Sequence, residues 1–384
     1  MKRKTTRWGK KSTIFPEAVL LLGDAQSCLD IEYATGFRAV DPVLFLKKGT
    51  RTCLVVPSLE VGRAERTTRK TAVVTPEKLG LVGARRRQFS EWAAALLKQE
   101  RIRRVVVPGS FPHGVAERLQ KKGVRVVVAK RDLFPERGVK RPDEMAKIKE
   151  AQQAAVIAMR AAIHMIAKSD IDASGVLVLG GKELTSEDVR RAITRVLVEH
   201  GCLSKDTIVA GGKQAVDPHE TGQGPLRAHE AIVIDIFPQH LTHGYWGDLT
   251  RTVVKGGAPA SLRLMYQAVK AAQTAALNHV RAGARCESVH RAAVMELEKR
   301  GFKTEVADGK GSGFIHSTGH GVGLAIHEAP SVASGPGRLR SGNVITIEPG
   351  LYYRGIGGIR IEDTVAVTPT GWRPLVPCEK KFEV

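Results

Sequence analysis

The chain has 384 residues, 42% of them hydrophobic, and this length and composition predict two globular domains with separate buried cores. It carries 60 lysine and arginine residues against 39 aspartate and glutamate residues, a formal net charge of +21. No apolar run approaches the roughly 18 residues of a membrane helix, so we expect no membrane association; without an export signal, the cytoplasm is the expected compartment.

The cysteines argue against a disulfide-stapled extracellular protein. The five residues Cys28, Cys53, Cys202, Cys286 and Cys378 are scattered and include no Cys-x-x-Cys pair. An odd number cannot all pair within one chain, and cysteine-built zinc sites use closely spaced thiolates. We therefore expect a reducing compartment and no thiolate metal site.

The positive charge begins in residues 1–12, which we expect to form a disordered basic tail. A charge excess of this size attracts polyanions in a salt-dependent way. The lysines and arginines are nevertheless spread over most predicted helices and lack interleaved aromatic residues. We therefore interpret the charge as a solvated surface and do not expect nucleic acid as a partner.

Residues 13–135 are predicted to form an N-terminal α/β domain, because short β-rich runs alternate with helical patterns. The predicted strands are Ala18–Leu22, Val43–Leu46, Thr52–Val56, Ala72–Thr75, Arg104–Val107 and Val124–Val128, and the predicted helices are Ser90–Glu100 and His113–Lys122. Ser90 is the expected N-cap of its helix. The alternation favours a substantially parallel sheet, and no glycine-rich phosphate loop follows any of the strands.

Residues 134–142, with two prolines and a glycine, separate this domain from a second one that we place at 141–384. A long helix, Asp143–Lys168, comes first, and its apolar stripe predicts core packing. The rest repeats one plan, in which helices end at Gly201 or Gly301 and a hairpin follows. The predicted helices are Ser186–His200, Ser261–Arg281 and Glu287–Arg300, and the hairpins pair Ala231–Phe237 with Asp248–Val254 and Asn343–Glu348 with Gly358–Val367. The plan predicts an α+β domain with an internal pseudo-twofold duplication.

Each predicted hairpin carries two acidic residues on adjacent strands. They are Asp235 with Asp248, and Glu348 with Glu362. Facing residues of a hairpin lie about 4.5 to 5.5 Å apart at Cβ, so each pair can converge. With one histidine from the glycine-rich segment 316–327, they would offer four carboxylates and an imidazole. This donor set fits two divalent ions about 3.5 to 4 Å apart, and it suits manganese, cobalt or zinc.

With these motifs, residues 141–376 resemble the metallopeptidase family of Xaa-Pro aminopeptidases, prolidases and methionine aminopeptidases, whose catalytic domain has the pita-bread fold. The first 135 residues resemble the N-terminal domain of its proline-specific and creatinase-like branches. The resemblance implies two divalent ions, manganese foremost, and a homodimer. It further implies the following ligands: Asp235 for the first ion, His320 and Glu348 for the second, and Asp248 and Glu362 as bridges between them.

The same resemblance implies an exopeptidase that hydrolyses an Xaa-Pro bond, in a dipeptide or at the N-terminus of a longer peptide, through a metal-bridging hydroxide. Glu348 would carry the proton to the leaving amine. Three histidines would contact the substrate: His219 and His327, which also have catalytic roles, and His316, which is typical of the proline-specific branch. Tyr352 and Arg360 would orient the metal carboxylates.

The chain departs from the family pattern between its first two acidic residues. Ile236-Phe237 replaces a small glycine step, and Asp248 follows Asp235 by 13 residues, about two more than usual. We expect a bulge or wider turn to restore the register, metal binding to persist and the substrate pocket to change. Two alternatives are a creatinase-like hydrolase that is not a peptidase, and a basic pseudoenzyme that binds protein or nucleic acid. The intact ligand set counts against both.

Overall fold

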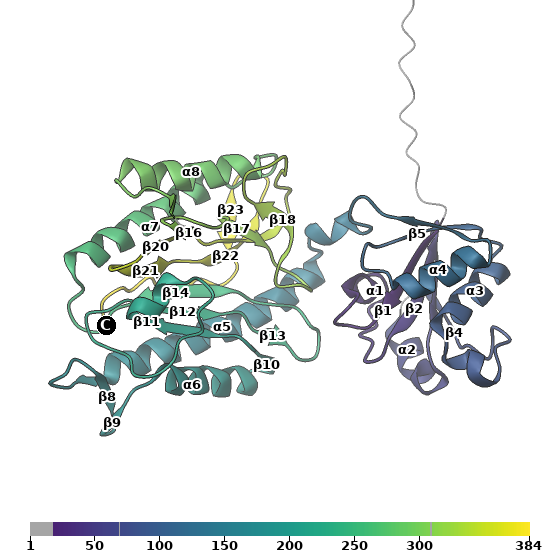
Figure 1. Ribbon diagram of the computed structural model, residues 1–384, viewed down its shortest axis with the longest axis horizontal. Coiled ribbons are helices and arrows are strands. Elements are labelled where there is room, and N and C mark those ends of the chain that lie inside the picture. The colour runs from purple at the N-terminus through teal and green to yellow at the C-terminus, as the bar shows by residue number, and fades with distance from the viewer. Residues whose placement is uncertain (1–17, 69, 308) are drawn as a thin grey trace, which may run out of the picture. The chain divides into compact units, whose positions relative to one another are not determined.

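A computed structural model describes residues 18–68, 70–307 and 309–384 (Figure 1). The chain divides after Pro135 into two compact units, and each has its own hydrophobic core. The predicted basic tail, residues 1–12, lies outside the described residues. Within the described ranges, no helix has both the length and the apolar character that crossing a membrane requires.

The N-terminal unit is built on one six-stranded sheet of order β4-β3-β2-β1-β5-β6. Its strands are β1 (Val19–Gly23), β2 (Val43–Lys48), β3 (Arg51–Val55), β4 (Thr71–Val74), β5 (Arg104–Val107) and β6 (Arg125–Val128), and its α-helices are α1 (Leu29–Thr35), α2 (Val61–Thr67), α3 (Phe89–Gln99) and α4 (His113–Lys121). The pairs β3–β4, β1–β5 and β5–β6 are parallel, but β1–β2 and β2–β3 are antiparallel. The sheet is therefore mixed, and the predicted substantially parallel sheet is wrong in its first three strands.

Strand β1 is buried along its whole length because helices cover both faces of the sheet. Leu20 packs in a core with Leu96 of α3, whereas Leu21 packs on the other face in a core with Ile31 of α1. Ser90 does not cap α3: it lies inside the first turn, buried, and accepts a hydrogen bond from Arg118.

The C-terminal unit places two helix pairs on opposite sides of its strands (Figure 1). The first half contains α5 (Pro142–Lys168), β7 (Asp170–Ile171), β8 (Leu177–Leu179), β9 (Lys182–Glu183), α6 (Ser186–Glu199), β10 (Cys202–Leu203), β11 (Ile208–Gly211), β12 (Ile232–Ile236), β13 (Gln239–His240) and β14 (Leu249–Val253). The second half contains α7 (Ala260–Asn278), α8 (Cys286–Lys299), β15 (Glu305–Ala307), β16 (Lys310–Ser312), β17 (Gly319–Gly321), β18 (Glu328–Val332), β19 (Val344–Ile347), β20 (Gly350–Tyr353), β21 (Gly357–Arg360), β22 (Asp363–Val367) and β23 (Trp372–Pro374). Gly201 and Gly301 follow α6 and α8 with φ of +66° and +87°, which confirms the predicted left-handed caps.

Strand alternation separates the apolar and the acidic residues of both hairpins. Ile234 and Ile236 of β12 pack in the core under α5 and α6, so Asp235, between them, faces the opposite side. Likewise, Ile345 and Ile347 of β19 pack in the core under α7 and α8. Both hairpins therefore turn their polar side toward the space between the two halves.

The second predicted hairpin is only partly correct. Strand β19 pairs with β22, but Gly357–Arg360 forms β21, which pairs with β20 in a separate two-stranded sheet. Pro349 lacks a backbone N–H and cannot extend the ladder. The chain leaves the main sheet after Ile347 and rejoins it only at Asp363.

The long connection between β12 and β14 contains a strand of its own. The β12–β14 ladder is unbroken from Ile232–Val253 to Ile236–Leu249, so no bulge is present. Instead, His240 in β13 pairs with Cys202 in β10. The additional residues of the loop are thus placed in a wider turn that contains β13.

Helix α5 approaches the hairpin closely just before Asp248. A Cβ atom on Gly247 would lie 2.6 Å from the backbone N of Gln152. The side chain of Gln152 donates to Asp248 O (2.9 Å) and accepts from Asp248 N (2.7 Å). Gly247 therefore allows the helix to hold the backbone of Asp248.

Gly247→Ala is expected to destabilise the protein by about 1–3 kcal/mol, because the added methyl group meets backbone atoms that cannot move away. The measurement is the thermal midpoint of unfolding. Gly257→Ala is the matched control: its added Cβ meets only the guanidinium of Arg263, at 3.8 Å. Equal midpoints for the two variants would show that the close approach has no energetic consequence.

Candidate metal centre

One pocket of about 650 Å³ in the C-terminal unit contains all five predicted metal ligands. Its lining includes Asp235, Asp248, His320, Glu348 and Glu362, together with His219, His316, His327 and Arg360. The ligands come from both halves of the duplication, which are joined where the N–H of Glu362 donates to Thr250 O (3.1 Å). Residues far apart in the sequence thus share one site.

The strand ends set the position of each carboxylate. Asp235 lies in β12, and Asp248 directly precedes β14. Glu348 directly follows β19, and Glu362 directly precedes β22. Because Ile347 pairs with Asp363, the two glutamates extend that ladder by one facing position.

The ligand atoms are close enough to share ions. The Nε2 atom of His320 lies 3.3 Å from Glu348 Oε1 and 3.6 Å from Asp248 Oδ2. One ligand atom each from Asp248, His320 and Glu362 lie within 4.8 Å of one another. Two ligands held 2.0–2.2 Å from one tetrahedral ion would be about 3.4 Å apart.

Two hydrogen-bonding features fit a bound cation. Among the described residues, the buried Oδ1 atom of Asp235 has no hydrogen-bond partner, whereas its Oδ2 accepts from Arg360 at 2.6 Å. The Nδ1 atom of His320 lies 3.1 Å from Gly321 O, and a carbonyl only accepts, so Nδ1 carries the proton. When His320 is neutral, its Nε2 lone pair therefore faces the carboxylates, as in histidines that bind metals.

The electrostatics also favour a bound cation. Burial and then the charges of Glu362, Asp235 and Glu348 raise the pKa of Asp248 well above its usual range. Burial and the charges of Glu348 and Asp235 do the same to the pKa of Glu362. Burial alone would raise the pKa of Glu348 too, but the hydrogen bond and charge of His320 lower it to about 2. Asp248 and Glu362 can both be ionised at neutral pH only if positive charge is added, which divalent metal ions provide.

Comparisons with known proteins agree with this site. The model of metallopeptidase family M24 matches residues 146–369. The chain belongs to metallopeptidase family M24. An Xaa-Pro dipeptidase of Lactobacillus delbrueckii subsp. lactis is 36% identical over 186 residues, 47% of each chain. One from Pyrococcus horikoshii is 29% identical over 359 residues, 92% of each chain.

Solved structures support the M24 fold over almost the whole chain. The prolidase from Pyrococcus horikoshii superposes with a TM-score of 0.78 at 27% identity and covers 95% of both chains. An Xaa-Pro dipeptidase from Bacillus anthracis has a TM-score of 0.80 at 23% identity, over 96% of this chain and 95% of that one. The predicted α/β N-terminal domain and pita-bread catalytic domain are confirmed.

A chain of hydrogen bonds surrounds the M24 centre. Arg360 reaches Asp235 with one nitrogen and donates to Tyr352 Oη with another, at 2.9 Å. The Nδ1 atom of His316 faces Ser317 O (2.8 Å), so its Nε2 accepts from Tyr352 Oη (3.0 Å). Tyr352 and Arg360 therefore lie where residues that orient a metal carboxylate would be needed.

The remaining predicted histidines lie at the pocket wall. The ring of His327 packs edge-on against His320, with centroids 4.3 Å apart. His219 lines the same pocket with an exposed side chain, next to Pro218, whose carbonyl accepts from Arg360 at 3.3 Å. Both histidines therefore share the pocket with the carboxylates and His320.

Sequence reasoning missed three supporting side chains. Gln152 holds the backbone of Asp248, Thr250 donates to Glu362 Oε2 (2.8 Å), and Thr346 donates to Glu348 Oε1 (3.2 Å). The only signal for Gln152 was a polar residue on the apolar stripe of the long helix. The threonines follow the strand alternation, since they share the faces that carry the acidic residues.

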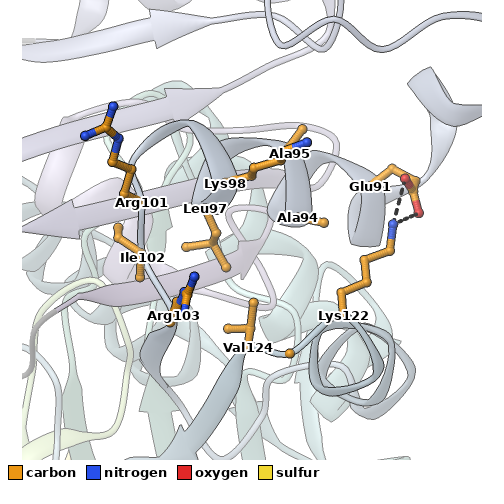
Figure 2. A pocket seen from close by; sticks show the side chains of 11 residues that line it. Glu91, Ala94, Ala95, Leu97, Lys98, Arg101, Ile102, Arg103, Lys122 and Val124 are labelled. Atoms are coloured by element: carbon orange, nitrogen blue, oxygen red, sulfur yellow. Dashed lines mark hydrogen bonds and ion pairs between the residues drawn. The ribbon is translucent and has the colours of Figure 1, made fainter.

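A second hollow, in the N-terminal unit, does not resemble a metal site (Figure 2). Its only carboxylate, Glu91, pairs with Lys122 at 2.9 Å. Lys98, Arg101 and Arg103 complete its charged lining, so the hollow is basic. We assign it no role in the metal centre.

Arg360→Lys is expected to weaken metal binding about 10- to 100-fold, the usual effect of losing a partner that orients a ligand. A lysine cannot contact Asp235 and Tyr352 together, because it lacks the planar fork of arginine. Calorimetric metal titration measures the affinity. Arg263→Lys, at an exposed ion pair with Glu383, is the matched control. Equal affinity in both variants would contradict the orienting role.

Proposed function

We propose that this M24 protein is a dinuclear-metal-dependent exopeptidase that hydrolyses Xaa-Pro bonds, in dipeptides or at the N-terminus of longer peptides. The observation that carries the proposal is the convergence of four carboxylates and His320 in one pocket. Relatives named Xaa-Pro dipeptidase and prolidase supply the substrate class. The alternatives of a non-peptidase hydrolase and of a pseudoenzyme are not favoured, because the complete donor set fits metal.

Asp235, Asp248, His320, Glu348 and Glu362 would hold the ions, with Asp248 and Glu362 between them. When bound, a pair of divalent ions polarises the scissile carbonyl and makes water a nucleophile at neutral pH. Glu348 lines the same pocket and would accept a proton from water and pass it to the leaving amine.

The histidines would bind and orient the substrate. His327 and His219 line the pocket and would donate hydrogen bonds to the peptide carbonyl as negative charge develops on its oxygen. His316 is held by Ser317 and Tyr352, so its ring forms a rigid wall for the residue after the cleaved bond. These roles remain part of the proposal.

Several further assignments belong to the same proposal. We propose domains at residues 13–135 and 141–384, and manganese as the native metal, with cobalt or zinc as alternatives, because the donors are mostly oxygens. A homodimer and a cytoplasmic location complete it. Cys53, Cys202, Cys286 and Cys378 form no disulfide, which agrees with a reducing compartment.

Removal of metal is expected to abolish hydrolysis of Ala-Pro, and manganese is expected to restore it. The measurement is proline release after treatment with a chelator and again after addition of manganese, cobalt or zinc. Tripeptides and tetrapeptides with proline in second position then separate dipeptidase from aminopeptidase activity. Creatine serves as the control substrate for the non-peptidase alternative. Peptide hydrolysis that is indifferent to both chelation and metal would end the proposal.

A further inference from the structure

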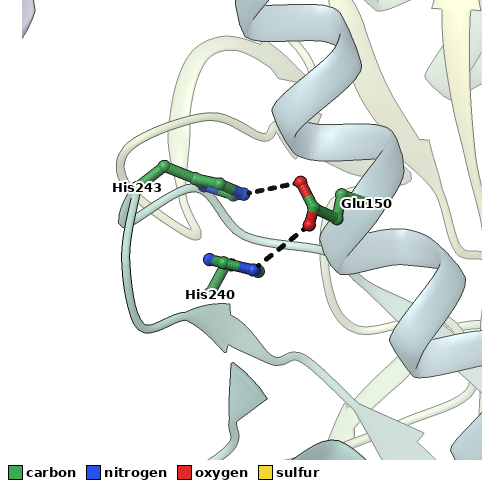
Figure 3. A group of neighbouring side chains, drawn as sticks. All are labelled: Glu150, His240 and His243. Carbon is green, nitrogen blue, oxygen red and sulfur yellow. Dashed lines mark ion pairs between the residues drawn. The ribbon is translucent and has the colours of Figure 1, made fainter. Parts of the chain in front are cut away.

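A second group of metal-ligand side chains lies outside the M24 pocket. Glu150 projects from α5, and His240 and His243 project from the loop between β12 and β14 (Figure 3). One ligand atom from each lies within 4.8 Å of the others. None of the three lines the pocket of the metal centre, so the group is separate from the site already described.

The distances in this group suit a shared ion better than hydrogen bonds. The Nε2 atoms of His240 and His243 each lie 3.4 Å from a different oxygen of Glu150. Hydrogen bonds between N–H and O are shorter, at about 2.7–3.2 Å, whereas two ligands of one tetrahedral ion are about 3.4 Å apart. Among the described residues, the buried Nε2 of His243 also makes no hydrogen bond.

The fold holds the two imidazoles and leaves the carboxylate accessible. The side chains of His240 and His243 are 11% and 12% exposed, whereas that of Glu150 is 62% exposed. The two rings stack with centroids 3.8 Å apart and an interplanar angle of 8°. The pairing of β13 with β10 fixes the backbone of His240. An ion could therefore enter from solvent on the side of Glu150.

We propose that Glu150, His240 and His243 bind one divalent transition-metal ion, with zinc as the best match. Two imidazoles and one carboxylate form a three-residue zinc donor set, and a water molecule would fill the fourth position. Calcium and magnesium prefer sites made of oxygen ligands, so we expect neither to bind.

We expect this site to bind zinc more weakly than the M24 centre does, because zinc binding must rearrange His240 and His243. The Nδ1 atoms of His240 and His243 accept from the N–H groups of Thr242 and Tyr245, each at 3.2 Å. An ion on Nε2 moves the ring proton to Nδ1, so both contacts must open and the stacked rings must tilt. His320 needs no such change, because its Nδ1 already faces a carbonyl. The central site therefore fills first.

Loading also affects a neighbouring segment of the M24 pocket. Trp246, three residues after His243, donates through its backbone N to Gly323 O and through its indole to Leu324 O, both at 3.0 Å. These carbonyls belong to the segment that carries His320 and His327. A rearranged loop should therefore change the environment of Trp246, which its fluorescence reports.

The test is a zinc titration by calorimetry, with bound metal measured at each free zinc concentration. Wild type should bind one equivalent more than His240→Gln/His243→Gln. His164→Gln/His279→Gln, which replaces two exposed histidines, one on α5 and one directly after α7, should keep the extra equivalent. Equal stoichiometry in wild type and the His240/His243 variant would overturn the proposal, even if the variant unfolds at a lower temperature, because the histidines would then only stabilise the loop.

Two further measurements keep the result interpretable. Glu150→Gln changes a mostly exposed residue, so the fold should survive while affinity for the extra equivalent falls at least about tenfold. Unchanged affinity would count against the site. His320→Gln should lose central metal but keep the extra equivalent. If the protein does not hydrolyse Xaa-Pro peptides, wild type should still bind one zinc equivalent more than the His240/His243 variant. If that additional equivalent is absent, manganese-dependent hydrolysis should still be observed.

Discussion

Asp248→Asn is expected to lower kcat/KM for Ala-Pro by at least about 100-fold. Loss of a residue that only orients a metal ligand costs up to about 100-fold, and loss of the charge of a proposed ligand should cost no less. The same substitution is expected to raise the thermal midpoint of the metal-free protein near pH 7. The two effects have one cause. Asp248 is buried among the charges of Glu362, Asp235 and Glu348, which raise its pKa, so ionising it without metal opposes folding.

The neutral amide keeps the backbone contacts of Asp248 with Gln152, since those use only the main chain. The substitution therefore removes the charge without removing the support. Asp170→Asn, at an exposed position in β7, is the matched control and should change neither rate nor midpoint. A lower midpoint for metal-free Asp248→Asn than for metal-free wild type would show that the carboxylates do not repel one another as described.

The five ligands were predictable because they follow from strand alternation and from turn positions. An acidic residue between two isoleucines, as at Asp235, faces away from the core that those isoleucines enter. A glycine follows the second helix of each half, and the structure shows the predicted left-handed conformation at both Gly201 and Gly301. Local patterns of this kind are short-range, so the sequence displays them directly.

Contacts between distant segments were not predictable in the same way. Gln152 supports Asp248 across 96 residues, and nothing local marks it as more than a polar residue in a packed helix. The register of the second hairpin depended on Pro349, whose missing N–H divides the region into two sheets. The loop after Asp235 contains strand β13 because it pairs with β10, which lies more than 30 residues earlier in the sequence. These are features for which packing decides between several locally acceptable structures.

The metal-free protein is expected to lose stability as pH rises from 7 to 8. Asp248 and Glu362 have raised pKa values when folded, so the folded state binds more protons than the unfolded state above about pH 4. Burial lowers the pKa of His320, but the hydrogen bond and charge of Glu348 outweigh burial, so the pKa is raised overall. The stability that protonated His320 adds to the fold is therefore complete below about pH 6.5 and is lost as pH rises through the folded pKa. Each proton that the folded state holds in excess costs about 1.4 kcal/mol per pH unit.

Other groups do not reverse this trend between pH 7 and 8. Burial lowers the pKa of His316 and His327, so both are neutral in either state above about pH 7. The lowered pKa of Glu348 stabilises the fold above about pH 4.3 and loses this effect only in acid, toward about 2. The carboxylates and His320 of the centre therefore set most of the slope.

Bound metal should reverse the pH dependence, because metal ions compete with protons for the same ligand atoms. The thermal midpoint of the chelated protein should fall between pH 7 and 8, and the midpoint of the manganese-loaded protein should hold or rise. The difference between loaded and metal-free midpoints should consequently widen with pH. In Asp248→Asn/Glu362→Gln the metal-free slope should flatten, since two of the three titrating groups are gone. A thermal midpoint of the metal-free wild type that rises between pH 7 and 8 would mean that the buried acids are not protonated in the absence of metal. The electrostatic argument for a dinuclear centre would then fail.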